Sequence, residues 1–161
     1  MPKFQKISPM LWLDGNAEEA ANFYTSIFKN SRVTDVMRNV DGVPGPKGGA
    51  LIVGFELDGL QFTALNGGPN FKFTEAISLV VLCDDQQEVD TLWSKLTGDG
   101  GQEVQCGWLK DKYGLSWQIV PKAFMGMVKD KDAKKVERVM GAMMQMVKFD
   151  IKKLEAAYEG H

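Results

Sequence analysis

The sequence contains almost no histidine or cysteine. Its single histidine, His161, is the last of the 161 residues, where we expect disorder and no role in a folded site. This argues against a catalytic triad, a Cys-His pair or a histidine-based metal centre inside the fold. The two cysteines, Cys83 and Cys106, have neither the spacing of a zinc site nor the density of a disulfide scaffold. We expect both to be free thiols.

Charge of one sign and long apolar runs are also scarce. With a formal net charge of -2 and mixed signs, the chain offers no broad basic surface, so we do not expect a nucleic-acid partner. The longest apolar run, near residues 77 to 83, is far too short to cross a bilayer, and residues 1 to 6 include no secretory segment. We therefore expect a cytoplasmic protein with no membrane partner.

One strand-helix unit occurs twice. Residues 7 to 13 read as a buried strand, which turns at Asp14-Gly15 into a helix capped by Asn16, with Glu19 completing a capping box. The apolar face of this helix has a period of 3.6. Its members are Ala20, Phe23, Tyr24, Ile27 and Phe28.

The same pattern returns 69 residues later, with a strand over residues 78 to 82, a cap at Asp85 and its box partner at Glu88. The apolar face is Val89, Leu92, Trp93 and Leu96. The same shift also maps residues 10 to 13 onto residues 79 to 82. We interpret this agreement as a duplication, although two unrelated amphipathic helices could share the same capping rules.

Further strands complete each copy. The first continues with strands over 32 to 40, 50 to 57 and 60 to 65, the last two joined by the hairpin turn Asp58-Gly59. The second continues with strands over 102 to 108 and 115 to 120, and residues 108 to 110 can serve as its third. The sequence predicts an α+β fold of duplicated βαβββ modules, about 5–68 and 74–121, in a single domain 1–121.

Residues 122–161 form a predicted helical C-terminal extension. Asp132 and Asp150 can each cap a helix there. The extension is rich in methionine, at positions 125, 127, 140, 143, 144 and 146. Methionine is adaptable packing material, so we favour helices docked on their own sheet or on a second copy of the chain over a cofactor site.

Aromatic and polar residues of the strands and of the connection between the copies are the candidates for a ligand cleft. They are Trp12, Asp14, Phe71, Phe73, Glu75, Trp108, Lys110, Trp117 and Gln118. Each has an alternative explanation: the tryptophans could be core or interface residues, and the charged residues could belong to solvated turns. The two phenylalanines could form a binding lip or a hydrophobic plug. No catalytic residue is assigned.

Several motifs carry a resemblance to a known family. They are residues 9 to 20 (PMLWLDGNAEEA), 64 to 69 (ALNGGP), 71 to 78 (FKFTEAIS), 106 to 111 (CGWLKD) and 113 to 121 (YGLSWQIVP). The chain resembles the vicinal oxygen chelate superfamily, with the glyoxalase/bleomycin resistance fold, and more narrowly its PhnB-like, 3-demethylubiquinone-9 3-methyltransferase-like branch. The resemblance spans nearly the whole chain, including the extension. It implies two modules curved into a half-barrel and a homodimer in which both chains contribute to the cleft.

The resemblance also implies where a metal would be held. In metal-using members the ligands come from the first and last strands of each module, which here places them at about Pro9, Phe62 or Thr63, Ser78 and Gln118. None is a histidine or a carboxylate, so we expect no catalytic divalent metal and no other cofactor. A cradle for S-adenosylmethionine is not expected either, because the glycine cluster at residues 98 to 101 follows a helix instead of opening one.

The leading interpretation is a PhnB-like protein with an aromatic small-molecule cleft, no catalytic metal and an unassigned substrate. Three alternatives stay open: the 3-demethylubiquinone 3-methyltransferase of the family name, a metal-dependent glyoxalase- or dioxygenase-type enzyme, and a non-catalytic drug-binding resistance-type protein. Fold alone does not choose among them.

Overall fold

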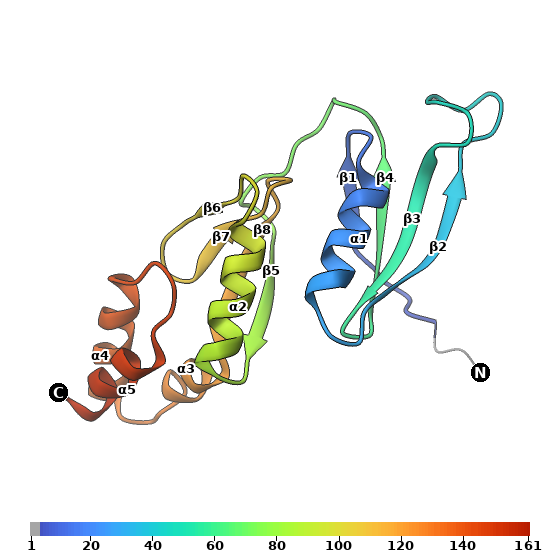
Figure 1. Ribbon diagram of the computed structural model, residues 1–161. Coiled ribbons are helices and arrows are strands. Elements are labelled where there is room, and N and C mark those ends of the chain that lie inside the picture. Colours follow the sequence, from blue (N-terminus) through green and yellow to red (C-terminus); the bar gives the residue numbers. More distant parts are fainter. Residues whose placement is uncertain (1–3) are drawn as a thin grey trace. The chain divides into compact units, whose positions relative to one another are not determined.

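The computed structural model describes residues 4–161, and the chain divides into two compact units, Met1–Lys72 and Phe73–His161. Each unit contains one four-stranded mixed sheet with a helix over one of its faces (Figure 1). No helix among the described residues is long and apolar enough to cross a membrane.

Unit 1 has the order β-α-β-β-β. Its elements are β1 (Met10–Leu13), α1 (Ala17–Ile27), β2 (Arg32–Arg38), β3 (Ala50–Leu57) and β4 (Leu60–Asn66). The sheet order is β1-β4-β3-β2, in which β1 lies parallel to β4 and the other pairs are antiparallel. The turn between β3 and β4 has positive φ at both Asp58 (47°) and Gly59 (78°), which is the geometry that a tight hairpin requires.

Three alanines bring α1 close to its sheet. Ala17, Ala20 and Ala21 are fully buried, and Tyr24 is the one large side chain of α1 that is fully buried. Tyr24 stacks on Phe55 at 6.2 Å between ring centroids, and Phe55 stacks on Phe62 at 5.4 Å. Burying each ring contributes roughly 1.5–3 kcal/mol before entropy is considered, so this aromatic stack carries much of the packing in unit 1.

Unit 2 repeats the same order and topology. Its elements are β5 (Ser78–Cys83), α2 (Gln86–Thr97), β6 (Gln102–Glu103), β7 (Trp108–Lys110) and β8 (Ser116–Pro121). The sheet order is β5-β8-β7-β6, with β5 parallel to β8. The four predicted apolar residues of α2, Val89, Leu92, Trp93 and Leu96, are all buried. The duplicated βαβββ architecture is confirmed.

The strand register of the duplication differs by one residue from the prediction. Three residues separate β1 from α1, whereas two separate β5 from α2. Leu13 pairs with the last residue of β4, and Cys83 pairs with the last residue of β8, so the strands correspond at a shift of 70 while the helix caps correspond at 69. Because side chains alternate between faces, a slip of one residue would have placed every strand side chain on the wrong face.

The two helix caps also differ. Asp85 accepts a hydrogen bond from the backbone N–H of Glu88 (2.8 Å), and the Glu88 carboxylate accepts one from Asp84 N–H, so a capping box forms one residue wider than predicted. Asn16 makes no such bond, which corrects the first predicted box. There the Asn66 side chain accepts from Ala17 N–H at 2.9 Å, because β4 brings its amide to the start of α1.

The prediction of one strand over residues 102 to 108 is also wrong. Only residues 102 and 103 form β6, and a turn follows in which Cys106 and Gly107 have φ of 59° and 80°. Their backbone N–H groups donate to the carbonyls of Met146 (2.8 Å) and Val147 (2.7 Å). Tertiary contacts therefore take over the hydrogen bonds that a longer strand would have used.

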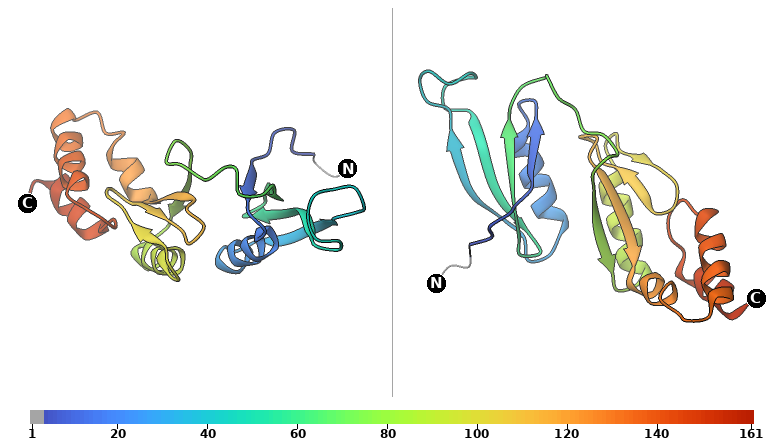
Figure 2. Two further views of the ribbon diagram at one scale, coloured as in Figure 1. Left: turned by 90° about the horizontal axis from the view of Figure 1, so that it is seen from above. Right: turned by 180° about the vertical axis from the view of Figure 1, so that it is seen from behind.

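The C-terminal extension is helical, as expected, and packs on the βαβββ module within unit 2. It consists of α3 (Lys122–Met127), α4 (Ala133–Met144) and α5 (Ile151–Glu159). Figure 2 shows these helices gathered beside the β5-β8-β7-β6 sheet. Their core is a cluster of five buried residues: Val120 of β8, Val139, Met146, Phe149 and Leu154.

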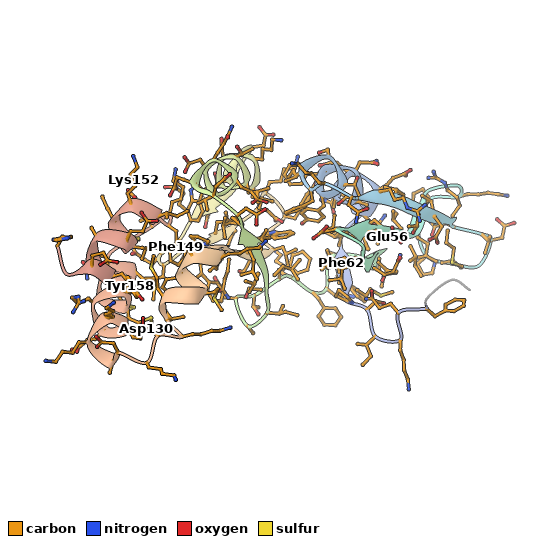
Figure 3. All side chains as sticks on the ribbon, turned by 90° about the horizontal axis from the view of Figure 1, so that it is seen from below. Glu56, Phe62, Asp130, Phe149, Lys152 and Tyr158 are labelled. Atoms are coloured by element: carbon orange, nitrogen blue, oxygen red, sulfur yellow. The ribbon has the colours of Figure 1, made fainter. Side chains whose placement is uncertain are left out.

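Polar contacts fix the extension in place. Gln86 of α2 donates to the Phe149 carbonyl and accepts from Ile151 N–H (2.9 and 2.8 Å). Tyr158 donates to the Asp130 carboxylate within the extension (Figure 3). Met146 is buried, and several other methionines pack against the same cluster. The extension therefore docks on its own sheet. Met140 and Met144 stay 38% and 59% exposed.

Candidate functional site

The candidate residues are best described by the two faces of each sheet. One face of each sheet packs against its helix, α1 or α2, and we call the opposite face the far face. Strand side chains alternate between the faces, so the register of neighbouring strands identifies the members of each. Each far face is described within its own unit.

On the far face of unit 1 lies Trp12 of β1. Its indole N–H donates to the Gly68 carbonyl at 2.9 Å, and its ring packs on the backbone of Gly67, where an added Cβ would lie 2.3 Å from the indole. Phe71 meets it edge to face, with 4.9 Å between ring centroids. The connection after β4 therefore folds its aromatic residue back onto Trp12, and Phe71 stays 64% exposed.

Polar side chains occupy the rest of the far face of unit 1. Arg32 of β2 forms an ion pair with Glu56 of β3 at 3.1 Å. Gln61 of β4 donates to the Thr34 hydroxyl at 3.3 Å. Thr63 lies beside Met10 of β1, its register partner. This face combines one ion pair, hydroxyl and amide groups, and an aromatic pair.

On the far face of unit 2 the strand register brings three of the predicted cleft residues into one cluster. Gln118 of β8 is the register partner of Trp108 on β7 and of Val80 on β5. Ser116 is the partner of Lys110 and of Ser78. The Gln118 amide donates to the Ser78 hydroxyl at 3.0 Å. Trp108, Lys110 and Gln118 therefore share one face, as a cleft would require.

Glu75 joins this cluster from the connection. It forms an ion pair with Lys110, and the side chains of Lys110 and Glu75 are 31% and 59% exposed. The hydrogen bond from Lys110 lowers the pKa of the Glu75 carboxyl below its ordinary value. The Glu75 carboxyl is therefore charged at neutral pH.

Ser116 was not predicted, yet it lies at the centre of the cluster. It is 1% exposed, and its hydroxyl has no hydrogen-bond partner among the described residues. Its position two residues before Gln118 on the same strand was the available signal, because residues i and i+2 share a face.

Trp117 and Asp14 are not brought to this cluster. Trp117 is 2% exposed on the helix-side face of β8, and its indole N–H donates to the Asp111 carboxylate at 2.9 Å. Asp111 also accepts from the backbone N–H groups of Tyr113 and Leu115, so the pair organises the β7–β8 turn. Asp14 is exposed in the β1–α1 turn, and Phe73 is half-buried at the start of unit 2.

The donors on the far faces do not fit a divalent metal. Where the last strand meets the first, the far-face register pairs that carry oxygen donors are Met10 with Thr63 in unit 1, and Ser78 with Ser116 and Val80 with Gln118 in unit 2. Hydroxyl groups and one amide oxygen form a poor donor set for zinc or manganese. Within residues 4–161, no group of three or more histidine, cysteine, aspartate or glutamate side chains could hold a metal ion.

The two cysteines are free thiols. Cys83 is fully buried at the end of β5, on the helix-side face. Burial, followed by the nearby Glu88 carboxylate, raises the pKa of its thiol to about 12. Since the thiolate is the reactive form, Cys83 is not a nucleophile at neutral pH.

Comparisons with known proteins identify the family. A sequence model described as 3-demethylubiquinone-9 3-methyltransferase matches residues 5–120. The chain belongs to this family. A PhnB protein from Bacillus cereus, which carries the same methyltransferase name, is 39% identical over 73% of this chain and 99% of its own, with a TM-score of 0.67. No curated protein matches.

More distant structures share the fold of this PhnB-like family. Protein PA1353 from Pseudomonas aeruginosa is 18% identical, covers 73% of this chain and 98% of its own, and has a TM-score of 0.60. The fosfomycin resistance protein FosX from Listeria monocytogenes, solved with Mn(II) and a sulfate ion, is 14% identical over 75% of this chain and 91% of its own, with a TM-score of 0.50. These likenesses show that the fold is shared.

The extent of the match bears on one expectation. The family model ends at residue 120, so α3, α4 and α5 lie beyond it. The matched range therefore does not reach the C-terminal extension. The far faces and the helices that back them lie within the matched range.

Proposed function

We propose that the chain is a PhnB-like protein of the vicinal oxygen chelate superfamily that binds a small molecule on the far faces of its sheets. The observation that carries this proposal is the cluster on unit 2, in which an aromatic ring, an ion pair, an amide and two hydroxyls share one face. A few convergent polar groups beside an aromatic surface are typical of small-molecule sites. The substrate stays unassigned.

A fragment screen by two-dimensional NMR on the 15N-labelled protein tests this proposal. We expect aromatic and polar fragments to shift the indole N–H resonance of Trp108 and the side-chain amide of Gln118. The indole of Trp117 is the internal control, because it is buried on the other face. Fragments that bind elsewhere and leave the Trp108 and Gln118 signals unmoved would refute the proposal.

We further propose that no catalytic metal takes part. On the first and last strands of each module, the far-face residues, among them Thr63, Ser78 and Gln118, include no carboxylate or imidazole, which leaves a metal-dependent glyoxalase- or dioxygenase-type reaction without suitable ligands there. Elemental analysis of protein purified without chelator tests this. Near one equivalent of zinc, nickel, manganese or iron per chain would contradict it.

The methyltransferase of the family name is the second candidate. The name of the matched family favours it, whereas the glycine cluster that might cradle a methyl donor joins the end of α2 to β6. An S-adenosylmethionine site of the doubly wound type uses a glycine-rich turn that opens a helix. We expect isothermal titration with S-adenosylmethionine to give no micromolar binding, and a clear micromolar isotherm would favour this candidate.

We propose a homodimer as the working assembly. Edge strands β1 and β5 expose apolar side chains, among them Met10 (53%), Val80 (55%) and Leu82 (47%). Exposed apolar edge strands invite a partner. Sedimentation at micromolar concentration should give about twice the chain mass of 17.9 kDa, and a monomer would refute the assembly.

Saturable binding without turnover would identify the non-catalytic, drug-binding alternative.

A further inference from the structure

The Ser116 hydroxyl needs a physical explanation. It is buried on the far face of unit 2, at the start of β8, and no described residue forms a hydrogen bond with it. A buried hydroxyl without a partner is costly, and native structures contain few of them. The register places Ser116 between Ser78 on one side and Lys110 on the other. The unused hydroxyl therefore lies next to a positively charged side chain.

The group that now neutralises Lys110 is easily displaced. Glu75 comes from the connection before β5, and its side chain is 59% exposed. Exposed ion pairs contribute little to stability, because water and salt screen them and two long side chains must be ordered. A second carboxylate could replace that of Glu75 at Lys110 at small cost.

We propose that the ligand of this site carries a carboxylate, which replaces the Glu75 carboxylate at Lys110 and accepts a hydrogen bond from the Ser116 hydroxyl. The inference rests on the proposed far-face site and gives its ligand a chemical class. A carboxylate bound there gains a charge-assisted bond from Lys110 and also provides the partner that Ser116 lacks. Trp108, one register pair further along β7 and β8, is placed to contact an apolar part of the same ligand.

A matched pair of probes tests this inference. Phenylacetate and the neutral phenylacetamide have nearly the same shape, and they differ in the charge that Lys110 would recognise. We would titrate both into the 15N-labelled full chain and follow the Trp108 indole and Gln118 amide signals. We expect phenylacetate to bind at least roughly tenfold more tightly than phenylacetamide, because a charge-assisted hydrogen bond exceeds a neutral one.

Three variants assign the preference to residues. Lys110→Met should abolish the preference for phenylacetate. Ser116→Ala should weaken phenylacetate binding roughly tenfold, the usual loss for a hydrogen bond to a charged group, without loss of stability, since it removes an unpaired buried hydroxyl. Glu75→Gln removes the competing carboxylate and should strengthen phenylacetate binding several-fold. Because Glu75 is exposed, Glu75→Gln should fold normally, so a change in its phenylacetate binding cannot be attributed to misfolding.

The outcomes separate this inference from the proposed function. Equal binding of both probes on the far face, unchanged in Lys110→Met, would overturn the carboxylate inference and leave the far-face site standing. A weaker response of Glu75→Gln to phenylacetate would likewise overturn the displacement of Glu75. If phenylacetate leaves the far-face signals unmoved, the inference fails, and the fragment screen then decides the proposed function independently.

Discussion

Gly107 allows the C-terminal extension to pack closely against the strands of unit 2. It has φ of 80°, and its backbone N–H donates to the Val147 carbonyl at 2.7 Å. A Cβ added at this position would lie 2.2 Å from a ring carbon of Phe149. Phe149 is 2% exposed and also packs against the Phe124 ring, at 4.9 Å between ring centroids. The ring therefore has little room to retreat.

Gly107→Ala should destabilise unit 2 through two separable effects. An L-residue in the left-handed region costs about 1–2 kcal/mol. Forcing an extra methyl group into a packed site adds about 1–3 kcal/mol. We expect a total loss of about 2–5 kcal/mol in the free energy of unfolding, a large share of the 5–15 kcal/mol or so that is typical of a domain.

Gly114→Ala provides the matched control. Gly114 has φ of 86°, also lies in unit 2, and has nothing within 4 Å of the added Cβ. Its substitution should therefore cost only the backbone strain, about 1–2 kcal/mol. Urea unfolding would be followed by tryptophan fluorescence in a Trp12→Phe background. The remaining tryptophans, at positions 93, 108 and 117, all report on unit 2.

A double-mutant cycle isolates the clash with the ring. In a Phe149→Ala background, Gly107→Ala should cost close to what Gly114→Ala costs in the unmodified chain, because the two ring carbons nearest the added Cβ are gone and only the Ile119 carbonyl oxygen, at 3.2 Å, stays close. Equal losses for Gly107→Ala and Gly114→Ala in the unmodified chain would refute the reasoning. They would mean that Phe149 moves aside freely.

Three further predictions use the same urea unfolding measurement. Asp85→Ala should cost about 1 kcal/mol, the usual value of a helix cap, whereas Asn16→Ala should cost far less, because its side chain makes no cap bond. Asp111→Ala should cost about 2–4 kcal/mol, since it leaves the buried Trp117 N–H and two backbone groups unpaired, and Asp111→Asn should cost less. The Cys83 thiol has a pKa raised from 9.0 to about 12, so between those pH values the unfolded chain binds fewer protons and the free energy of unfolding should fall by up to about 1.4 kcal/mol per pH unit, a contribution that Cys83→Ala should remove while Tyr158 and the lysines continue to titrate.

The parts of the fold that local sequence specifies were predicted well. The apolar stripe of α2 was found because four large residues recur at helical spacing and all become buried. The β3–β4 hairpin was found because Asp58-Gly59 suits a turn that needs two positive φ angles. In both cases the signal lies within one element and needs no knowledge of its neighbours.

The errors arose where tertiary contacts decide. The strand residues 10 to 13 and 79 to 82 are apolar on both faces, so no alternation showed that the true shift is 70. The cap of α1 is supplied by Asn66, which is 49 residues from its partner Ala17. Among the candidate site residues, Trp117 and Gln118 are adjacent in sequence and therefore point to opposite faces. Only the burial of Trp117 shows which of them lies on the far face.

The corrected register shows what the duplication preserved and what it changed. Gln61 and Ser116 occupy equivalent positions, because β4 and β8 correspond at a shift of 55 when Leu13 is matched with Cys83. Their partners on the neighbouring strands are Glu56 and Lys110, so equivalent far-face positions carry opposite charges. Packing against α1 and α2 constrains the helix-side faces to stay apolar, whereas nothing in the backbone topology constrains the far faces.

The opposite charges are each neutralised by a different element. Glu56, which is labelled in Figure 3, is paired with Arg32 on a neighbouring strand of the same sheet. Lys110 is paired with Glu75, which lies on the connection between the units. A partner fixed on a strand is preorganised, and a partner on a connection can leave without breaking the sheet. The duplicated scaffold therefore presents one charge whose partner is held on the same sheet and one whose partner lies on a connection, which makes Lys110 the position at which to test ligand specificity.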